Sequence, residues 1–242
     1  MKFEEVEYNN HAMKKTETKK ILFSQLKPFF ASKGFKLVIP KFSGFVKQFE
    51  GGMDWVYFDT NDYNPCQNVY YSVMKRINSI DDIWQEIDKK YFNTERLNIE
   101  FASTLNFSYE TINGLNQSRY LPDILLETDI KINTELILQF MNSNAIPLLE
   151  RFNNIREIDT EINGEVFWES DWRKPYQIGS FAFHRLIVAY LSGNKNFEKL
   201  YNYHVGLFDY NNKDFPVKII NGKNSIEYLK HVLEKSGKWN SA

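Results

Sequence analysis

Histidine is the side chain that most readily gains and loses a proton near neutral pH, and the chain has four: His11, His184, His204 and His231. His184 and His204 fall on the apolar faces of segments with helical periodicity, which is typical of histidines packed between helices. With a carboxylate supplied by residues 165–171, either one could instead act as a general acid or base. That hypothesis describes an enzyme of unrecognised type whose site lies between two halves of the chain.

Metal and cofactor chemistry finds no support in the spacing of the side chains. None of the four histidines shows the spacing of metal ligands, and Cys66 is the only cysteine, so no metal site, disulfide or cofactor is predicted. The sequence also lacks the common motifs of phosphate-binding loops, serine hydrolases and zinc proteases. It therefore favours a protein without catalytic activity over an enzyme.

The glycine pair in FVKQFEGGMDWVYFD is the closest approach to a phosphate loop. Such a loop requires a helix directly after the glycines, and MDWVYFD is a poor helix start. The alternation of aromatic and β-branched residues predicts a hairpin instead. A three-residue loop, Glu50 to Gly52, would bury one face that carries Phe45, Phe49, Met53, Trp55 and Tyr57.

The densest acidic stretch is REIDTEINGEVFWESDWRKP, residues 156–175. If its first part is a strand, its acidic residues share one face, and Ile158 and Ile162 lie on the other. A solvated surface is the simplest interpretation of these charges, and a docking surface for a basic protein partner is the sharper hypothesis. The acidic set consists of Glu157, Asp159, Glu161, Glu165, Glu169 and Asp171.

Positive charge gathers at the other end of the chain. Residues 1–50 contain ten Lys and five Glu and carry +5, whereas the whole chain has a net charge of -1. Solvation of an amphipathic helix accounts for the lysines, and a nucleic-acid contact is the alternative, disfavoured by the overall charge. The lysines concerned are Lys14, Lys15, Lys19, Lys20, Lys27 and Lys33.

The pattern of apolar residues predicts an α+β fold, with an antiparallel sheet packed against helices and followed by a helix-rich C-terminal half. A first helix over about residues 16–33 should stop at Gly34, and strands are predicted at 35–39, 42–50, 53–60, 69–77 and 99–109. A helix is predicted after residue 79, and further helices at 134–142, 147–153, 178–191, 196–208 and 225–234. A turn-rich stretch at 113–123 predicts two subdomains, 1–112 and 113–242.

The segment ILFSQLKPFFASKGFKL resembles a pattern found in small bacterial families of unknown function, in which a helix reading LKPxLxxxGF precedes a curved sheet. Leu26, Lys27, Pro28, Gly34 and Phe35 carry the resemblance, which covers about residues 16–110. Some of these families resemble immunity proteins that neutralise toxins. The resemblance implies a protein partner, and no catalytic residue follows from it.

The first ten residues lack the apolar core of a secretory signal, and the longest apolar run, Leu186 to Leu191, is too short to cross a bilayer. Together with the single cysteine, this predicts a cytoplasmic protein. The sequence thus predicts a non-catalytic bacterial protein that binds another macromolecule, with a basic toxin as one candidate. An enzyme using His184 or His204 and a nucleic-acid binder remain the alternatives.

Overall fold

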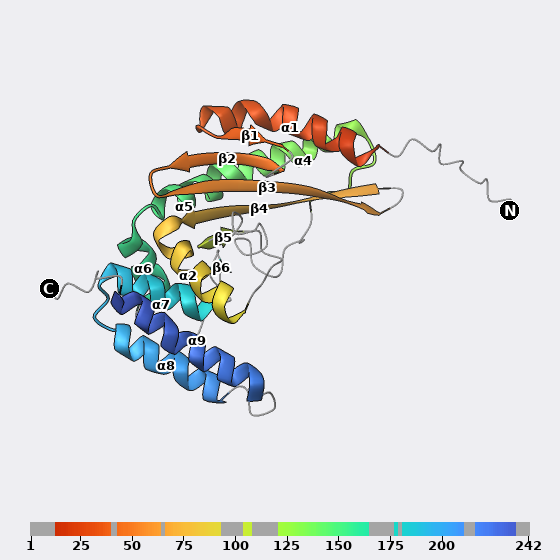
Figure 1. Cartoon of the computed structure of the whole chain (residues 1–242). Helices are drawn as coiled ribbons and strands as arrows, with labels where there is room; N and C mark the ends of the chain where they lie inside the picture. Colours follow the sequence, from red (N-terminus) through yellow and green to blue (C-terminus); the bar gives the residue numbers. More distant parts are fainter. Residues whose placement is uncertain are drawn as a thin grey trace.

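An antiparallel sheet lies at the centre of the molecule (Figure 1). The computed structural model describes residues 13–39, 43–63, 66–92, 104–107, 121–164, 177–178, 181–210 and 216–235. Within these residues the sheet has six strands in the order β1 to β6, each antiparallel to its neighbours. They are β1 (Lys36–Val38), β2 (Gly44–Phe49), β3 (Gly52–Tyr63), β4 (Cys66–Ile77), β5 (Leu105–Phe107) and β6 (Gln177–Ile178).

Helices make up most of the remaining described residues and dominate the C-terminal half, so the predicted α+β fold is confirmed. The helices described before residue 112 are α1 (Lys15–Ser32) and α2 (Asn78–Tyr91). The others are α4 (Glu127–Phe140), continued by a π-helical turn at Met141–Ala145, then α5 (Ile146–Arg151), α6 (Ile155–Asn163), α7 (Phe181–Ser192), α8 (Phe197–Tyr210) and α9 (Pro216–Lys235). No described helix is long and apolar enough to cross a membrane.

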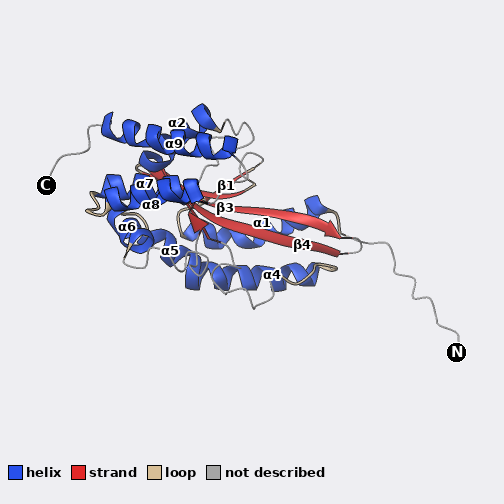
Figure 2. Cartoon of the chain, turned by 90° about the horizontal axis from the view of Figure 1, so that it is seen from below, coloured by secondary structure: helices blue, strands red, loops and turns tan. Residues whose placement is uncertain are grey.

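Helices α1 and α4 pack side by side against one face of the sheet (Figure 2). The apolar residues of α1 recur at helical spacing, and Phe30 stacks on Phe45 of β2 with ring centroids 4.2 Å apart. On α4, Phe140 contacts Tyr71 of β4 edge to face. Gly34 ends α1 with φ +83°, the left-handed conformation that a glycine stop requires. The aromatic side chains of the N-terminal half therefore fill the interior between sheet and helices.

Helix α7 is the buried centre of the C-terminal half. Every residue from 183 to 190 is buried, as the nearly continuous apolar sequence predicts. Helices α2, α6, α8 and α9 all contact it (Figure 1). Gly193 follows with φ +74° and ends the helix as expected.

The β2–β3 hairpin is confirmed, but the predicted register is wrong by one residue. Phe49 pairs with Gly52, so the loop consists of Glu50 and Gly51 alone. Gly51 takes the positive φ, +85°, and Gly52 belongs to the strand, where a Cβ atom would lie 2.1 Å from the Arg76 carbonyl oxygen. As a result, Phe45 and Phe49 share a face with Asp54, Val56 and Phe58, and not with Met53, Trp55 and Tyr57.

The sheet joins distant parts of the sequence. β6 comes from the C-terminal half and pairs with β5, with Leu105 opposite Ile178. Only residues 104–107 of the strand predicted at 99–109 are described. The division into subdomains at residue 112 remains a prediction, because residues 108–120 lie outside the described part of the chain.

Candidate functional site

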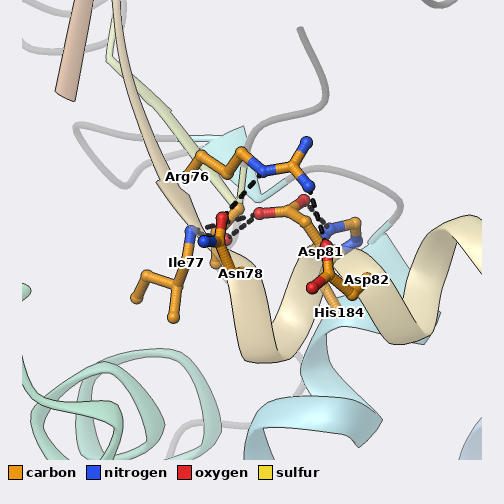
Figure 3. Close-up of polar contacts among 7 residues, drawn as sticks. Arg76, Ile77, Asn78, Asp81, Asp82 and His184 are labelled. Carbon is orange, nitrogen blue, oxygen red and sulfur yellow. Dashed lines mark hydrogen bonds and ion pairs between the residues drawn. The ribbon is translucent and has the colours of Figure 1, made fainter. Parts of the chain in front are cut away.

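The fold brings one histidine into contact with a carboxylate, as the enzyme hypothesis requires (Figure 3). His184 of α7 lies with Nε2 3.2 Å from Oδ1 of Asp81 on α2. The other Asp81 oxygen accepts hydrogen bonds from the Thr104 hydroxyl and from the Ile77 backbone N–H. Groups from four segments thus meet at the Asp81 carboxylate and form a polar cluster between the sheet and two helices.

Burial decides what this cluster can do. The His184 and Asp81 side chains are 1% and 0% exposed, so among the described residues no open path leads a substrate to the imidazole. The neighbouring Asp82 is on the surface and pairs with Arg76 at 2.8 Å, beside the buried cluster (Figure 3). The arrangement suits a structural role, in which Asp81 fixes the start of α2 to α7 and to Thr104.

The carboxylate that meets His184 was not the one predicted. The enzyme hypothesis assigned it to residues 165–171, which lie outside the described part of the chain. Asp81 is 103 residues away from His184 in sequence, and only the packing of α2 on α7 brings the two together. Its place in the apolar stripe of α2, next to Ile80 and Trp84, is the one sequence signal of burial.

His204 on α8 is also buried, at 1% exposed. Its burial lowers its pKa to about 4, and the positive charge of Arg185 acts in the same direction. The imidazole is therefore neutral at physiological pH, as befits a histidine in the helical core. No group of three or more histidine, cysteine, aspartate or glutamate side chains within the described ranges could hold a metal ion.

The first part of the acidic stretch belongs to helix α6, and not to the strand that was considered for it. In α6, Ile158 and Ile162 are one turn apart and buried, and Asp159 is buried beside them. Asp159 accepts hydrogen bonds from the side-chain amides of Asn163 and Asn194, both at 2.8 Å. The prediction that Glu157, Asp159 and Glu161 share one exposed face is therefore wrong, because a helix rotates Asp159 into the core.

The other acidic residues of that stretch have separate environments. Glu157 is exposed, and Glu161 pairs with Arg151 at 2.5 Å. Glu165, Glu169 and Asp171 lie outside the described residues. The docking hypothesis for this surface thus depends on Glu157 among the described members of the set.

A buried arginine on α7, Arg185, holds the C-terminal end of α6. This arginine is 1% exposed on α7, and its Nε donates to the side-chain oxygen of Asn163 at 3.1 Å. Its Nη2 donates to the backbone carbonyl of Ile162, at the C-terminal end of α6. A cation at a helix C-terminus is favourable, so the guanidinium stabilises α6 while it stays within the core.

In contrast to these buried clusters, a groove of about 660 Å³ opens at the surface between α1 and β1. On the α1 side, the groove is lined by a row of residues one turn apart: Thr16, Lys20, Ser24 and Lys27. The other wall and the floor are apolar and consist of Phe23, Leu37 and Ile39. Ile39 is 56% exposed, so it offers apolar surface to a molecule in the groove.

An ordered ion-pair cluster lies at one end of the groove. Asp59 of β3 accepts from Lys19 at 2.7 Å and from Lys15 at 3.1 Å, and the hydroxyls of Tyr57 and Tyr70 donate to the same carboxylate. Partial burial alone would raise the pKa of Asp59, but the hydrogen bonds from Lys19, from the Thr60 backbone and from Lys15 outweigh it and hold the pKa below its usual range. The ammonium group of Lys19 is therefore already paired with a carboxylate of the protein itself.

Lys20 and Lys27 differ from Lys19. Both side chains are exposed, and neither forms an ion pair with another residue in the described part of the chain. Ser43, at the end of the groove, has φ +43°, a left-handed conformation that non-glycine residues rarely adopt. Its hydroxyl donates to the Phe58 carbonyl at 3.0 Å and accepts from Lys19 at 3.4 Å, which holds this end of the groove in place.

Comparisons with known proteins do not assign the chain to a group. No family model, no curated protein and no solved structure matches it. The groove and the buried clusters are thus the features from which a function has to be argued.

Proposed function

We propose that this chain works by binding another protein, and that the groove between α1 and β1 receives an acidic segment of that partner. An immunity protein, which the sequence resemblance implies, would be one protein of this kind, with a toxin as the partner. The observation that carries the proposal is the contrast between Lys19, which pairs with Asp59, and Lys20 and Lys27, which line the groove and form no ion pair within the described residues.

The lining of the groove favours a polypeptide over a nucleic acid. A single-stranded nucleic acid needs aromatic faces on which its bases can stack. The aromatic residue that lines this groove is Phe23, which is 4% exposed, so its ring offers little surface. An acidic peptide needs cations beside an apolar surface, and Lys20, Lys27 and Ile39 supply both.

The buried clusters support a binding role less directly. His184 and His204 are each 1% exposed, so neither is available to a substrate in the described arrangement. Recognition therefore relies on the surface, and the groove is a concave part of it whose charged lining residues are all lysines.

The proposal is tested with a pool of short fluorescent peptides in which glutamate alternates with random residues. Binding is measured by anisotropy for the natural chain and for the double variant Lys20→Glu with Lys27→Glu. We expect the natural chain to bind the pool and the variant to lose at least about tenfold in affinity, because two ion pairs become repulsions.

The matched control is Lys195→Glu with Lys235→Glu, which changes the charge by the same amount on exposed lysines near α8 and α9. It should leave binding unchanged. Equal loss in both variants would indicate attraction to net charge alone and overturn the proposal. Tight binding of single-stranded DNA would support the nucleic-acid alternative, and binding of a lysine-rich peptide that is lost in Glu157→Lys would return the site to the acidic stretch.

A further inference from the structure

The groove lies beside an unpaired edge of the sheet. β1 is the terminal strand, paired with β2 through Lys36 opposite Val46 and Leu37 opposite Phe45. No other strand within the described ranges pairs with its outer edge. A terminal strand presents backbone N–H and C=O groups that an added strand can satisfy.

The side chains of β1 and α1 enclose the space in which an added strand would lie. Leu37 pairs with Phe45, so it faces the same side of the sheet as the helix-covered core, and Ile39, in the turn directly after β1, lines the groove together with it. Across from them is the α1 row that contains Lys20 and Lys27. An edge strand flanked by a helix is a geometry in which extended peptides bind by strand addition.

We infer that the acidic partner segment binds as an additional strand on β1. This inference rests on the proposed function, and it adds the conformation and the side-chain pattern of the ligand. Residues of the segment that face α1 place a central apolar side chain over Leu37 and Ile39 and acidic side chains beside Lys20 and Lys27. The residues between them face the opposite side of the sheet and contribute little to recognition.

The dimensions agree with a short segment. From Thr16 to Lys27 the helix rises about 16 Å at 1.5 Å per residue, which matches about five residues of extended strand. Lys20 and Lys27 are about 10 Å apart along the axis of α1. In an extended strand, residues i and i+4, which point to the same face, are about 13 Å apart. The flexible lysine side chains cover that difference.

The expected ligand pattern is therefore acidic, any, apolar, any, acidic. A fluorescent probe with the core Glu-Thr-Ile-Thr-Glu carries both carboxylates and the isoleucine on one strand face. A control peptide, Thr-Glu-Ile-Glu-Thr, has the same composition but carries its carboxylates on the face opposite to the isoleucine. We expect the full chain to bind the first at least about tenfold more tightly, a difference that Lys20→Glu with Lys27→Glu should abolish.

Strand addition is tested separately by N-methylation of the backbone. Two versions of the first probe are methylated on alternate amides, so that one version blocks the N–H groups facing β1 and the other blocks those facing away. Binding should be lost in one version and kept in the other, because an added strand uses every second N–H group.

The possible outcomes separate this inference from the proposed function. If both methylated probes and the face-switched control bind as well as the original, while the groove variant still loses binding, the groove binds acidic peptides but not as strands, and the inference is wrong. If no acidic peptide binds the natural chain above the level of the groove variant, the proposed function itself is wrong.

Discussion

The region around α7 and the region between α1 and β1 both contain charged side chains, but these side chains differ in burial and in their partners. Beside α7, Asp81 and Arg185 are buried and fully engaged by neighbouring backbone and side-chain groups. Along α1, Lys20 and Lys27 are exposed and form no ion pair with the described residues. A buried charge has to be paired within the fold, whereas a charge exposed beside a cavity is available to a binding partner.

This contrast changes how a histidine beside an aspartate should be interpreted. The contact between His184 and Asp81 has the geometry of an acid-base pair, but both side chains are sealed from solvent. The less familiar combination of lysine and isoleucine along the groove has the access that the histidine lacks. Access to solvent, more than residue type, separates the two regions.

The largest loss of unfolding free energy is expected at the buried cluster around Asp81. Asp81→Ala removes the acceptor of three hydrogen bonds and should cost about 3 to 5 kcal/mol of unfolding free energy in urea denaturation. The matched control is Asp82→Ala on the same turn, whose ion pair with Arg76 is at the surface, so it should cost no more than about 0.5 kcal/mol. Similar losses in both variants would mean that burial does not separate these two aspartates.

The next largest loss of stability is expected at the buried ion pair between Lys75 of β4 and Asp54 of β3. Lys75 is 0% exposed, 2.6 Å from Asp54 and 2.8 Å from the Asn153 side-chain oxygen. Burial raises the pKa of Asp54 and lowers that of Lys75, although each partner's charge opposes the shift. Lys75→Met should cost about 3 kcal/mol, because it leaves the Asp54 carboxylate buried without its cation.

The double variant Lys75→Met with Asp54→Leu should recover most of that loss, since two apolar side chains replace the pair without leaving a charge behind. Chemical denaturation at neutral pH measures both variants. A double variant less stable than Lys75→Met would show that the pair itself, and not the isolated charge, controls stability.

His204 should give the protein a pH-dependent stability. Its pKa is about 4 in the folded chain and 6.5 in the unfolded chain, so between these values the unfolded state binds more protons. The contribution of His204 to the unfolding free energy is therefore fully present above pH 6.5, and an amount on the order of 3 kcal/mol is lost as the pH drops toward 4. His204→Gln should flatten this part of the profile, and an unchanged slope would place the titration elsewhere.

Asp59 should make a smaller contribution to the unfolding free energy, which is lost at lower pH. Its pKa is lowered in the folded chain, so its stabilisation is present above 3.8 and is lost as the pH falls below that value. At neutral pH, Asp59→Asn should cost about 1 kcal/mol, because the cluster is partly open to solvent and screened. Denaturation curves of the two proteins should converge in acid, and a constant difference would exclude the ion pairs as the cause.

Much of this fold could be predicted from the sequence, because its apolar residues recur at clear spacing. The continuous apolar run predicts α7 at the centre, and the alternation from Val69 to Ile77 predicts β4 with its buried face. Gly34 and Gly193 both stop helices where expected. These features depend on local periodicity, which a single sequence contains.

The errors arose where two structures fit the same residues. Ile158 and Ile162 suit one face of a strand and one face of a helix equally well, and the contacts of Asp159 with Asn163 and Asn194 select the helix. In the β2–β3 hairpin, either glycine could occupy the turn, and the close approach of the Arg76 carbonyl to Gly52 selects Gly51. Tertiary contacts decide both cases.

The sites depended even more on tertiary contacts. Asp81 is distant in sequence from His184, and the lysines of α1 look like an ordinary solvated face until β1 is placed beside them. The candidate groove could therefore not be predicted from residue spacing.

The smallest effect on stability is expected in the groove. Lys20→Glu with Lys27→Glu should change the unfolding free energy by no more than about 0.5 kcal/mol, since both side chains are exposed. A loss above about 2 kcal/mol would show that these lysines support the fold, and it would remove the contrast with the region around α7.

The most direct test of the binding role is a titration of the isotope-labelled chain with the Glu-Thr-Ile-Thr-Glu probe, followed through its backbone amide chemical shifts. The account predicts saturable shifts along α1 and at Lys36 to Ile39, with the amides around Asp81 and His184 unchanged. Shifts centred on α2 and α7, or none at saturating peptide, would contradict it.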